Sequence, residues 1–372
     1  MSDYADDVKS SDANVASDAW YSYSGPENDV VLSTRVRLAR NLASFPFPKK
    51  FKDDDAERIR TLVFDAFSHC ENPDQYTGVV ASELDSLGSE ILDERGVLEN
   101  TASKGKGTGI IIRTDGKISC TVNDVDHVRI AAFVPGLDGS GAFELCRKVD
   151  DELQNTIQFA ANYDLGFLNS SVADTGSGMK ISCRVHLPSL SFSQKFKDVI
   201  GFSSEKNISV RDCFGVGGVS GSSLGFYYQI SSRNCGNGNE LDQLANVVSY
   251  VKYLVENERR ERDFVLRTRQ TELRDRIYRA YAKVKFASLV TMREAIEIIS
   301  DIKWGKNLGF FSNVTDTDLC ALLYRVQNGH LQFVLKSKNF NFPKDIADNA
   351  ELKAANLRAL ILQEAFENLK VN

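Results

Sequence analysis

The chain lacks several features that mark specialised classes of protein. Its seven cysteines are odd in number and widely spaced, and no Cys-x-x-Cys pair occurs, so neither a disulfide scaffold nor a metal site is expected. No run approaches the roughly 20 apolar residues that a membrane span needs. The first residues are not a basic segment followed by an apolar one. These absences predict a cytoplasmic protein with reduced thiols and no contact with a membrane.

A basic excess is also missing. The 45 Lys and Arg residues are outnumbered by 51 Asp and Glu residues, and the formal net charge is -6 at pH 7. This balance argues against a nucleic-acid partner, because general nucleic-acid binders usually carry a basic excess. Any anion-binding site must therefore be local. At 372 residues and 42% hydrophobic, the chain can bury a large core, and we expect one large domain with an appended helical part.

Glycine and proline are absent between Asn239 and Trp304, which predicts a long helix with Asn239 as its cap. Apolar residues recur there at intervals of three and four, as in an amphipathic helix. Before Asn239, short apolar runs alternate with glycine-containing turns. The runs 109–113 and 118–122 flank Thr114-Asp-Gly-Lys117, a strong hairpin signal. The pattern predicts an α+β fold with a central antiparallel sheet flanked by helices.

These patterns divide the chain into four segments. Residues 1–24 are rich in Ser, Asp and Ala with few large apolar groups, and we expect a mobile arm. Residues 25–238 form the first part of the α+β domain, and the helix at 239–290 completes it. Residues 291–372 form a C-terminal helical region, which opens with the capping-box pattern of Thr291 and Glu294 and ends in a helix near 350–369.

The run Val31-Leu-Ser-Thr-Arg-Val-Arg-Leu-Ala-Arg-Asn41 concentrates arginines in an apolar, strand-like segment. In an alternating strand Arg35 and Arg37 point to one face, where their guanidinium groups repel each other unless an anion lies between them. A polyphosphate is the natural candidate. The alternative is a solvated edge strand whose arginines reach scattered carboxylates.

A second group of arginines lies between Arg259 and Arg279, but it alternates with acidic residues such as Glu256, Glu258 and Asp263. A helix face of mixed sign is normally solvated and carries weak ion pairs. We therefore expect no anion site there.

Together with later segments, the arginine run resembles the ATP:guanido phosphotransferases, the family of creatine, arginine and protein-arginine kinases. The similar segments occur in the family's order over roughly residues 28 to 310, and the bacterial protein-arginine kinase branch fits best because only a short arm precedes Val31. The resemblance implies that residues 25–290 form a catalytic-type domain. The segments are Asn123-Asp-Val-Asp-His-Val-Arg129, Gly166–Gly178, Val185-His-Leu-Pro188, the glycine-rich loop that follows Arg211, and Glu256-Asn-Glu-Arg259.

The resemblance implies that ATP or ADP binds with Mg²⁺ carried by the nucleotide. Lys180 stands where the family has Arg, so it keeps the charge but loses the planar fork that binds phosphate. The implied nucleotide contacts are Ser33, Thr34, Arg35, Val36, Arg37, Arg129, Lys180, Ile181, Ser182, Cys183, Arg184, Arg211, Asp212, Cys213, Phe214, Gly215 and Val216.

The acceptor side departs from the family pattern. Phosphorylation of a guanidinium needs an acceptor that is deprotonated and aimed at the γ-phosphorus, and in the family carboxylates and a cysteine do this. The matching positions here are Val125, Val216 and Ser171. Asp124 is a candidate base in place of the missing glutamate, and the alternative is a structural or solvated loop carboxylate. His127 is expected to be an internal hydrogen-bonding histidine.

Two functions follow from the resemblance. One is an active kinase that phosphorylates arginine or protein arginine with a remodelled acceptor side. The other is a nucleotide-binding pseudokinase that acts as an adaptor. By resemblance we also expect a homodimer through the C-terminal region, because the helices at 239–287 and 350–369 have large apolar faces. The stretch Lys353-Ala-Ala-Asn-Leu-Arg358 matches the branch's phosphoarginine-receptor motif without its acid, which leaves Lys353 and Arg358 to meet an anion.

Overall fold

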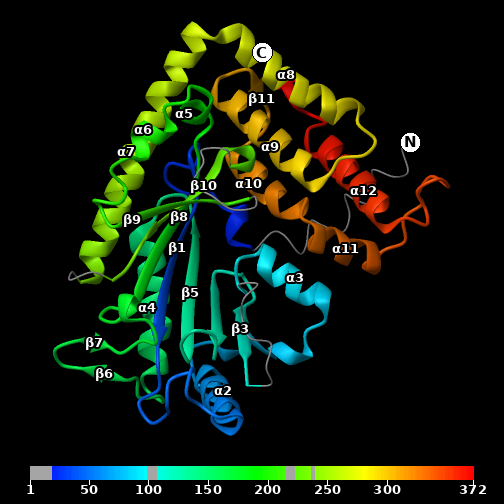
Figure 1. The fold of residues 1–372 in the computed structure, drawn as a ribbon. Helices are drawn as coiled ribbons and strands as arrows, with labels where there is room; N and C mark the ends of the chain where they lie inside the picture. The colour runs from blue at the N-terminus through cyan, green and yellow to red at the C-terminus, as the bar shows by residue number, and fades with distance from the viewer. Residues whose placement is uncertain (1–18, 99–106, 215–222, 236–238) are drawn as a thin grey trace.

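The computed structural model describes residues 19–98, 107–214, 223–235 and 239–372 (Figure 1). Its centre is an eight-stranded sheet in the order β2-β3-β4-β5-β1-β8-β10-β9, in which every pair is antiparallel. The predicted α+β fold is confirmed, and so is the hairpin, since β3 pairs with β4. The strands are β1 Val31–Arg40, β2 Tyr76–Val80, β3 Gly109–Arg113, β4 Ile118–Val122, β5 Val128–Pro135, β8 Met179–His186, β9 Ile208–Asp212 and β10 Tyr227–Ser232, with the small pair β6 Ala161–Asn162 and β7 Gly166–Phe167 beside them.

Helices cover one face of this sheet and form the main core with it. Helix α4 (Gly139–Leu153) packs on β1 and β5, and α7 (Glu240–Thr268) packs on β8 and β10. Alternate strand residues such as Val36, Leu38 and Ile130 are buried between them. The remaining helices of this part are α2 Asp53–Ser68, α3 Ser86–Glu94, α5 Pro188–Phe192 and α6 Phe196–Ile200. The opposite face carries Arg35 and Arg37 of β1, and beside them two small apolar clusters around Ile110 of β3 and Phe133 of β5.

The single long helix predicted from residue 239 is wrong, because the chain forms two helices that meet at Arg269. Helix α7 ends at Thr268 and α8 spans Gln270–Phe286. The predicted cap is confirmed, since the Asn239 side chain accepts a hydrogen bond from the Asp242 N–H at 2.9 Å. At the break, Arg269 contacts a distant segment: it donates to the Phe192 carbonyl at 3.1 Å, and its guanidinium lies 3.9 Å from the centre of the Phe192 ring.

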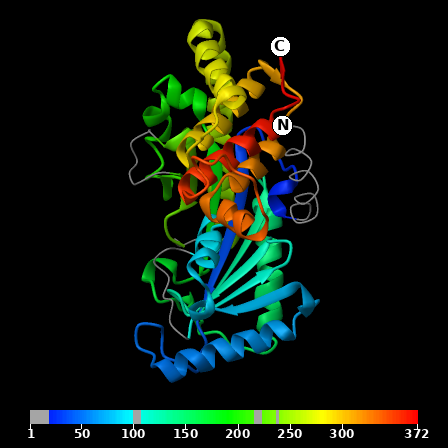
Figure 2. The same cartoon turned by 90° about the vertical axis from the view of Figure 1, so that its right-hand side faces the viewer.

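The C-terminal helices surround a second hydrophobic core at one end of the sheet, with α2 at the other end (Figure 2). The Thr291 capping box is confirmed by the hydrogen bond from the Glu294 N–H to the Thr291 hydroxyl. No helix in the described ranges is long and apolar enough to cross a membrane. The elements are α9 Met292–Asn307, β11 Phe311–Ser312, α10 Asp316–Arg325, α11 Asn328–Ser337, α12 Ala350–Ala365 and β12 Lys370–Val371.

This second core takes up the apolar faces that motivated the expected dimer. Leu273 and Ile277 of α8 and Leu362 of α12 are fully buried within the chain. The homodimer stays a prediction. Arg358 of α12 is also internal: it is 2% exposed and donates to the Val326 and Val290 carbonyls at 2.8 and 2.9 Å. Its guanidinium therefore supports the fold of this region. Arg358 also lines, with Lys353, a pocket of about 580 Å³, and an anion at these two residues stays a prediction.

Part of the predicted arm packs against the sheet. Residues Trp20–Ser22 form a short 3-10 helix, and Trp20 is only 4% exposed. Its ring stacks on Phe133 of β5 with centroids 5.8 Å apart, while Tyr21 stacks on Tyr324 of α10 at 4.6 Å. Residues 20–22 are therefore packed against the sheet through two adjacent aromatic rings, and the mobility of the arm stays a prediction. Residues 1–18 lie outside the described residues.

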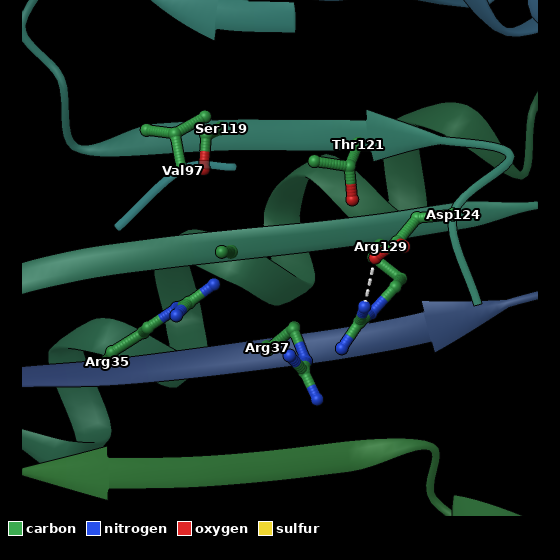
Figure 3. A pocket seen from close by; sticks show the side chains of 8 residues that line it. Arg35, Arg37, Val97, Ser119, Thr121, Asp124 and Arg129 are labelled. Atoms are coloured by element: carbon green, nitrogen blue, oxygen red, sulfur yellow. Dashed lines mark hydrogen bonds and ion pairs between the residues drawn. The ribbon is translucent and has the colours of Figure 1, made fainter. Parts of the chain in front are cut away.

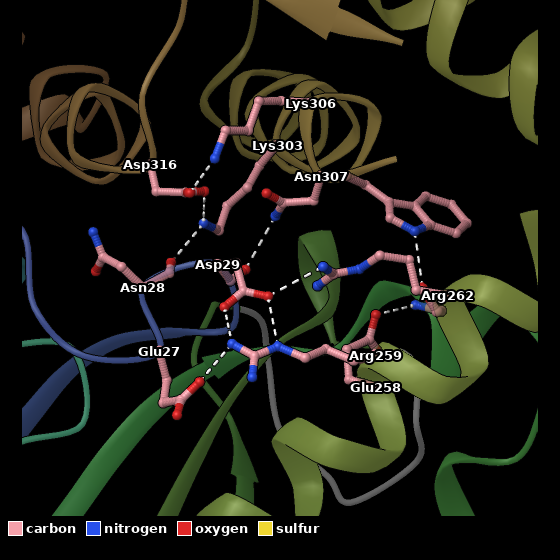
Figure 4. A network of polar contacts seen from close by, with 12 residues as sticks. Glu27, Asn28, Asp29, Glu258, Arg259, Arg262, Lys303, Lys306, Asn307 and Asp316 are labelled. Atoms are coloured by element: carbon pink, nitrogen blue, oxygen red, sulfur yellow. Dashed lines mark hydrogen bonds and ion pairs between the residues drawn. The ribbon is translucent and has the colours of Figure 1, made fainter. Parts of the chain in front are cut away.

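The segment that leads into β1 is tied to both parts of the chain by charged groups (Figure 4). Arg259 of α7 donates to Asp29 at 2.6 and 3.1 Å, and Arg262 donates to the same carboxylate at 3.1 Å. Burial by itself would raise the pKa of Asp29, but these two guanidinium groups outweigh it and lower the pKa. From the C-terminal side, Lys303 donates to the Asn28 carbonyl at 2.9 Å.

This network corrects the interpretation of a solvated face for only part of the second arginine group, since Arg267, Arg274 and Arg279 are exposed as expected. Glu258 is fully buried and accepts hydrogen bonds from the Ser189 and Leu190 N–H groups at 2.9 and 3.0 Å, at the start of α5. Glu261 is 6% exposed and accepts from Lys195. Alternating charge signs do not distinguish such an interior face from a solvated one.

Candidate functional site

Strand register places the predicted phosphate-binding cations on one face of the sheet. In β1, Arg35 and Arg37 stand opposite Ser182 and Lys180 of β8, and Arg37 stands opposite Ala131 of β5. Directly opposite residues of an antiparallel pair project to the same face. The same rule applies to the pairs that β5, β8, β10 and β9 form. It places six cationic side chains on one face, here called the cationic face: Arg35, Arg37, Arg129, Lys180, Arg184 and Arg211.

Four of the residues implied as nucleotide contacts have side chains on the opposite, core-facing side, namely Thr34, Val36, Ile181 and Cys183. The Thr34 hydroxyl donates to the Gly136 carbonyl at 2.7 Å, and burial raises the pKa of the Cys183 thiol to about 12. Alternation is the physical reason, since successive strand side chains point to opposite faces. These four side chains cannot reach a ligand on the cationic face, whereas Ser33 and Ser182 share the face with the arginines.

Three of the cations meet at a small cavity on this face (Figure 3). Its volume is about 10 Å³, and it is partly open to solvent. Three guanidinium groups and one carboxylate give the cavity a positive balance, and planar guanidinium groups suit the oxygens of phosphate. Its lining residues are Arg35, Arg37, Val97, Ser119, Thr121, Asp124, Arg129 and Ala131.

Asp124, the candidate base, is the carboxylate of this cavity. It forms an ion pair with Arg129, and the two side chains are only 14% and 9% exposed. Figure 3 shows the Asp124 carboxylate turned toward the Arg129 guanidinium. In this conformation Asp124 is the counter-ion of a predicted phosphate-binding arginine, and a role as base stays a prediction.

The loop 123–127 carries Asp124 and is held at both ends. Asn123 has a φ of 59°, a left-handed conformation that Asn tolerates, and its side chain donates to the Ala56 and Gly107 carbonyls, each at 2.8 Å. Asp126 accepts from the Asn41 side chain at 2.7 Å. Asp124 and Val125 form the apex between these anchors.

His127 completes the second anchor. It is fully buried, its Nδ1 accepts from the Leu42 N–H at 3.0 Å, and its Nε2 lies 3.0 Å from the Pro46 carbonyl. These partners require the neutral ring with its proton on Nε2. Burial lowers the pKa of His127 to about 4. The prediction of an internal hydrogen-bonding histidine is confirmed.

The lowered pKa of His127 predicts a loss of stability in acid. The unfolded ring takes up a proton near pH 6.5 and the folded ring only near pH 4, so the stability it contributes is present above pH 6.5 and lost as pH falls toward 4. The shift is worth about 3 kcal/mol. Urea unfolding at pH 6.5 and at pH 4 measures the difference in unfolding free energy between the wild type and His127→Asn. This difference should be smaller at pH 4 by about 3 kcal/mol. The exposed His69→Asn is the control, and a constant difference for His127→Asn would contradict the prediction.

Two of the three altered acceptor positions lie on loops that are joined to each other. The Asp126 carboxylate accepts from the Ser170 N–H at 2.7 Å, which ties the loop of Val125 to the residue that precedes Ser171. Val125 is 45% exposed, and Ser171 is half-buried. Gly215 and Val216 lie outside the described residues. The site therefore presents a valine and a serine where the family resemblance implies a carboxylate and a thiol.

The remaining predicted contacts lie at the other end of the cationic face. Arg184 donates to the Tyr324 hydroxyl of α10 at 3.0 Å, and Arg211 is exposed on the edge strand β9. Cys213 and Phe214 pack against the second core, where burial raises the pKa of the Cys213 thiol to about 11. Asp212 is half-buried at the end of β9.

The site predicted from the sequence does not include the aromatic residues that lie at this end of the cationic face. The Arg35 guanidinium lies 4.9 Å from the centre of the Phe133 ring, on which Trp20 stacks. The position of Phe133 opposite Arg35 depends on the β1–β5 register. No pattern in the sequence indicates that register or the contact of Tyr324 with Arg184.

The sheet order, the helices on one face and the cationic opposite face define a protein of the phosphagen kinase fold. Lombricine kinase superposes with a TM-score of 0.55 at 19% identity, covering 66% of this chain and 70% of that chain. The substrate-free duplicated taurocyamine kinase from Schistosoma mansoni gives 0.54 at 21% identity, covering 63% of this chain and 35% of that chain. Identities this low establish the fold alone.

Sequence comparison gives the family. Residues 58–261 match the ATP:guanido phosphotransferase C-terminal catalytic domain, and residues 270–371 match the protein-arginine kinase McsB C-terminal domain. The protein-arginine kinase of Halothermothrix orenii is 31% identical, covering 84% of this chain and 89% of that protein. That of Geobacillus stearothermophilus is 30% identical, covering 86% and 88%. The chain belongs to the ATP:guanido phosphotransferase family, as its motifs predicted.

Proposed function

We propose that this protein binds ATP or ADP on the cationic face and that its guanidinium-acceptor side is degraded. The observation that carries the first part is the meeting of Arg35, Arg37 and Arg129 at one cavity. In phosphoryl transfer, cations of this kind neutralise the phosphate oxygens while the substrates are held in line. Mg²⁺ would be carried by the nucleotide phosphates, because this ion is usually held by substrate phosphates together with few protein ligands.

The acceptor side supports the second part of the proposal. Val125 and Ser171 carry no charge with which to orient a guanidinium, and Asp126 is occupied by Asn41 and the Ser170 N–H. Asp124 is engaged by Arg129. The nearby acids therefore have partners other than an acceptor, which favours a nucleotide-binding pseudokinase that works with a partner chain, as an adaptor or a homodimer.

The second candidate is an active kinase for arginine or protein arginine. Relatives that align with most of the chain are named protein-arginine kinases, and the loop carboxylate Asp124 lies at the phosphate site. In this case Asp124 would leave Arg129 and accept the proton of the guanidinium. The two functions differ in turnover, whereas both require nucleotide binding.

Nucleotide binding is tested by Arg129→Ala. Removal of a charged hydrogen-bond partner of phosphate should weaken Mg-ADP binding by about 1.5 to 3 kcal/mol, or roughly 10- to 100-fold. Isothermal titration calorimetry measures the change. Arg113→Ala is the matched control, because Arg113 pairs with Asp115 outside the cavity. Failure of the wild type to bind Mg-ATP or Mg-ADP at millimolar concentration would contradict the proposed function.

A further inference from the structure

The cavity on the cationic face already contains an anion of the protein itself. The Asp124 carboxylate pairs with Arg129, and both side chains are largely buried. A nucleotide phosphate can take over Arg129 only when this ion pair breaks. The charged residues that line the cavity are Arg35, Arg37, Arg129 and Asp124.

These four charged residues differ in how firmly their backbone is held. Arg35 and Arg37 belong to β1 and Arg129 belongs to β5, two central strands whose backbones are paired on both sides. Asp124 belongs to the loop 123–127, where strand pairing has ended. Loop segments open at a lower free-energy cost than paired strands. Asp124 is thus the charged group that can leave with the least disturbance of the sheet.

The loop is built so that its apex can move while its ends stay in place. Asn123 is held by the Ala56 and Gly107 carbonyls, and Asp126 is held by the Asn41 side chain and the Ser170 N–H. Val125, next to Asp124 at the apex, is 45% exposed. A rotation confined to the apex would release Asp124 without breaking either anchor.

We propose that Asp124 is an internal anion that competes with nucleotide phosphate for Arg129 and is displaced from it when a nucleotide binds. The proposal rests on the proposed function and adds its regulation. The Asp124 carboxylate neutralises one of the three cations and repels an incoming phosphate. A ligand of several negative charges that contacts Arg35, Arg37 and Arg129 together can compensate for the lost pair, whereas a singly charged anion cannot. The competing carboxylate thereby selects for polyphosphates.

The test is Asp124→Asn, which keeps the size of the side chain and removes its charge. Calorimetry with Mg-ADP and, separately, with inorganic tripolyphosphate should show binding about tenfold tighter than in the wild type, as expected when a charged competitor is removed. Asp115→Asn is the matched control. It removes one negative charge from an Asp–Arg pair of the neighbouring β3–β4 hairpin and should leave both affinities unchanged.

The possible results separate this proposal from the proposed function. Equal affinities in the wild type and Asp124→Asn would overturn the internal anion and leave nucleotide binding intact. Weaker binding in Asp124→Asn would also overturn it, because the carboxylate would then be part of the bound site. Absence of binding in both proteins, with circular dichroism showing that both are folded, would overturn the two proposals together. If Asp115→Asn binds the ligands as much more tightly as Asp124→Asn does, the gain comes from net charge alone, and the proposal is overturned as well.

Discussion

The triple variant Val125→Glu, Ser171→Cys and Val216→Glu is expected to form phosphoarginine at least 10²-fold faster than the wild type. The wild type should transfer phosphate to free or protein arginine very slowly, because uncharged residues stand where the family resemblance implies two carboxylates and a thiol. Each such group is worth a factor of about 10² or more. Transfer from radiolabelled ATP measures the rate, and acid lability distinguishes phosphoarginine from phosphoserine.

Two further variants show whether a gain comes from the acceptor site. Adding Arg129→Ala to the triple variant should remove most of the recovered rate, since the phosphate cage is then incomplete. Val172→Glu places a carboxylate on a side chain that is 90% exposed, close to Ser171, and should have no effect. A wild-type protein that already phosphorylates arginine at ordinary kinase rates, about 1 to 100 per second, would show that the pseudokinase proposal is wrong.

Replacing Asp316 with Ala is expected to destabilise the protein by about 3 to 5 kcal/mol, the cost of leaving a buried charge without its partner. Asp316 of α10 pairs with Lys303 and Lys306 of α9. Lys303 is only 2% exposed, and burial lowers its pKa, so its ammonium group depends on this carboxylate and on the Asn28 carbonyl. Urea unfolding at pH 7 measures the loss.

The control for Asp316→Ala is Asp275→Ala, which breaks an ion pair with Arg279 whose side chains are 61% and 75% exposed. Exposed pairs contribute at most about 1 kcal/mol, so this variant should remain close to the wild type. Adding Lys303→Met to Asp316→Ala should recover much of the lost stability, because the uncompensated charge is then gone. If Asp316→Ala unfolds within 1 kcal/mol of the wild type, the buried pair is not a determinant of stability.

Features that depend on neighbouring residues were predictable from the sequence. The alternation of β1 correctly put Arg35 and Arg37 on one face, and the caps at Asn239 and Thr291 formed as expected. Strand alternation and capping act within a few residues, so their causes are present in the local sequence. The family motifs likewise occupy short segments, which is why the membership could be recognised before the fold was known.

Features that depend on distant residues were not predictable. The helix break at Arg269 coincides with a contact to Phe192, and the N-terminal segment is held to the sheet by Trp20 packing on Phe133. Neither contact has a counterpart in local propensity. The buried Glu258 was interpreted as part of a solvated face, because its partners, the Ser189 and Leu190 N–H groups, lie about 70 positions away along the chain.

The sequence by itself determined the family, the α+β class and the local concentration of cations in β1. Tertiary structure decided which cations meet at one cavity, because Arg129 reaches Arg35 and Arg37 only through the register of β1 with β5. It also decided that Asp124 faces Arg129 within that cavity. Short-range patterns specify the conformation of a segment, whereas the distances between charges on different segments are set by the packing of the whole chain.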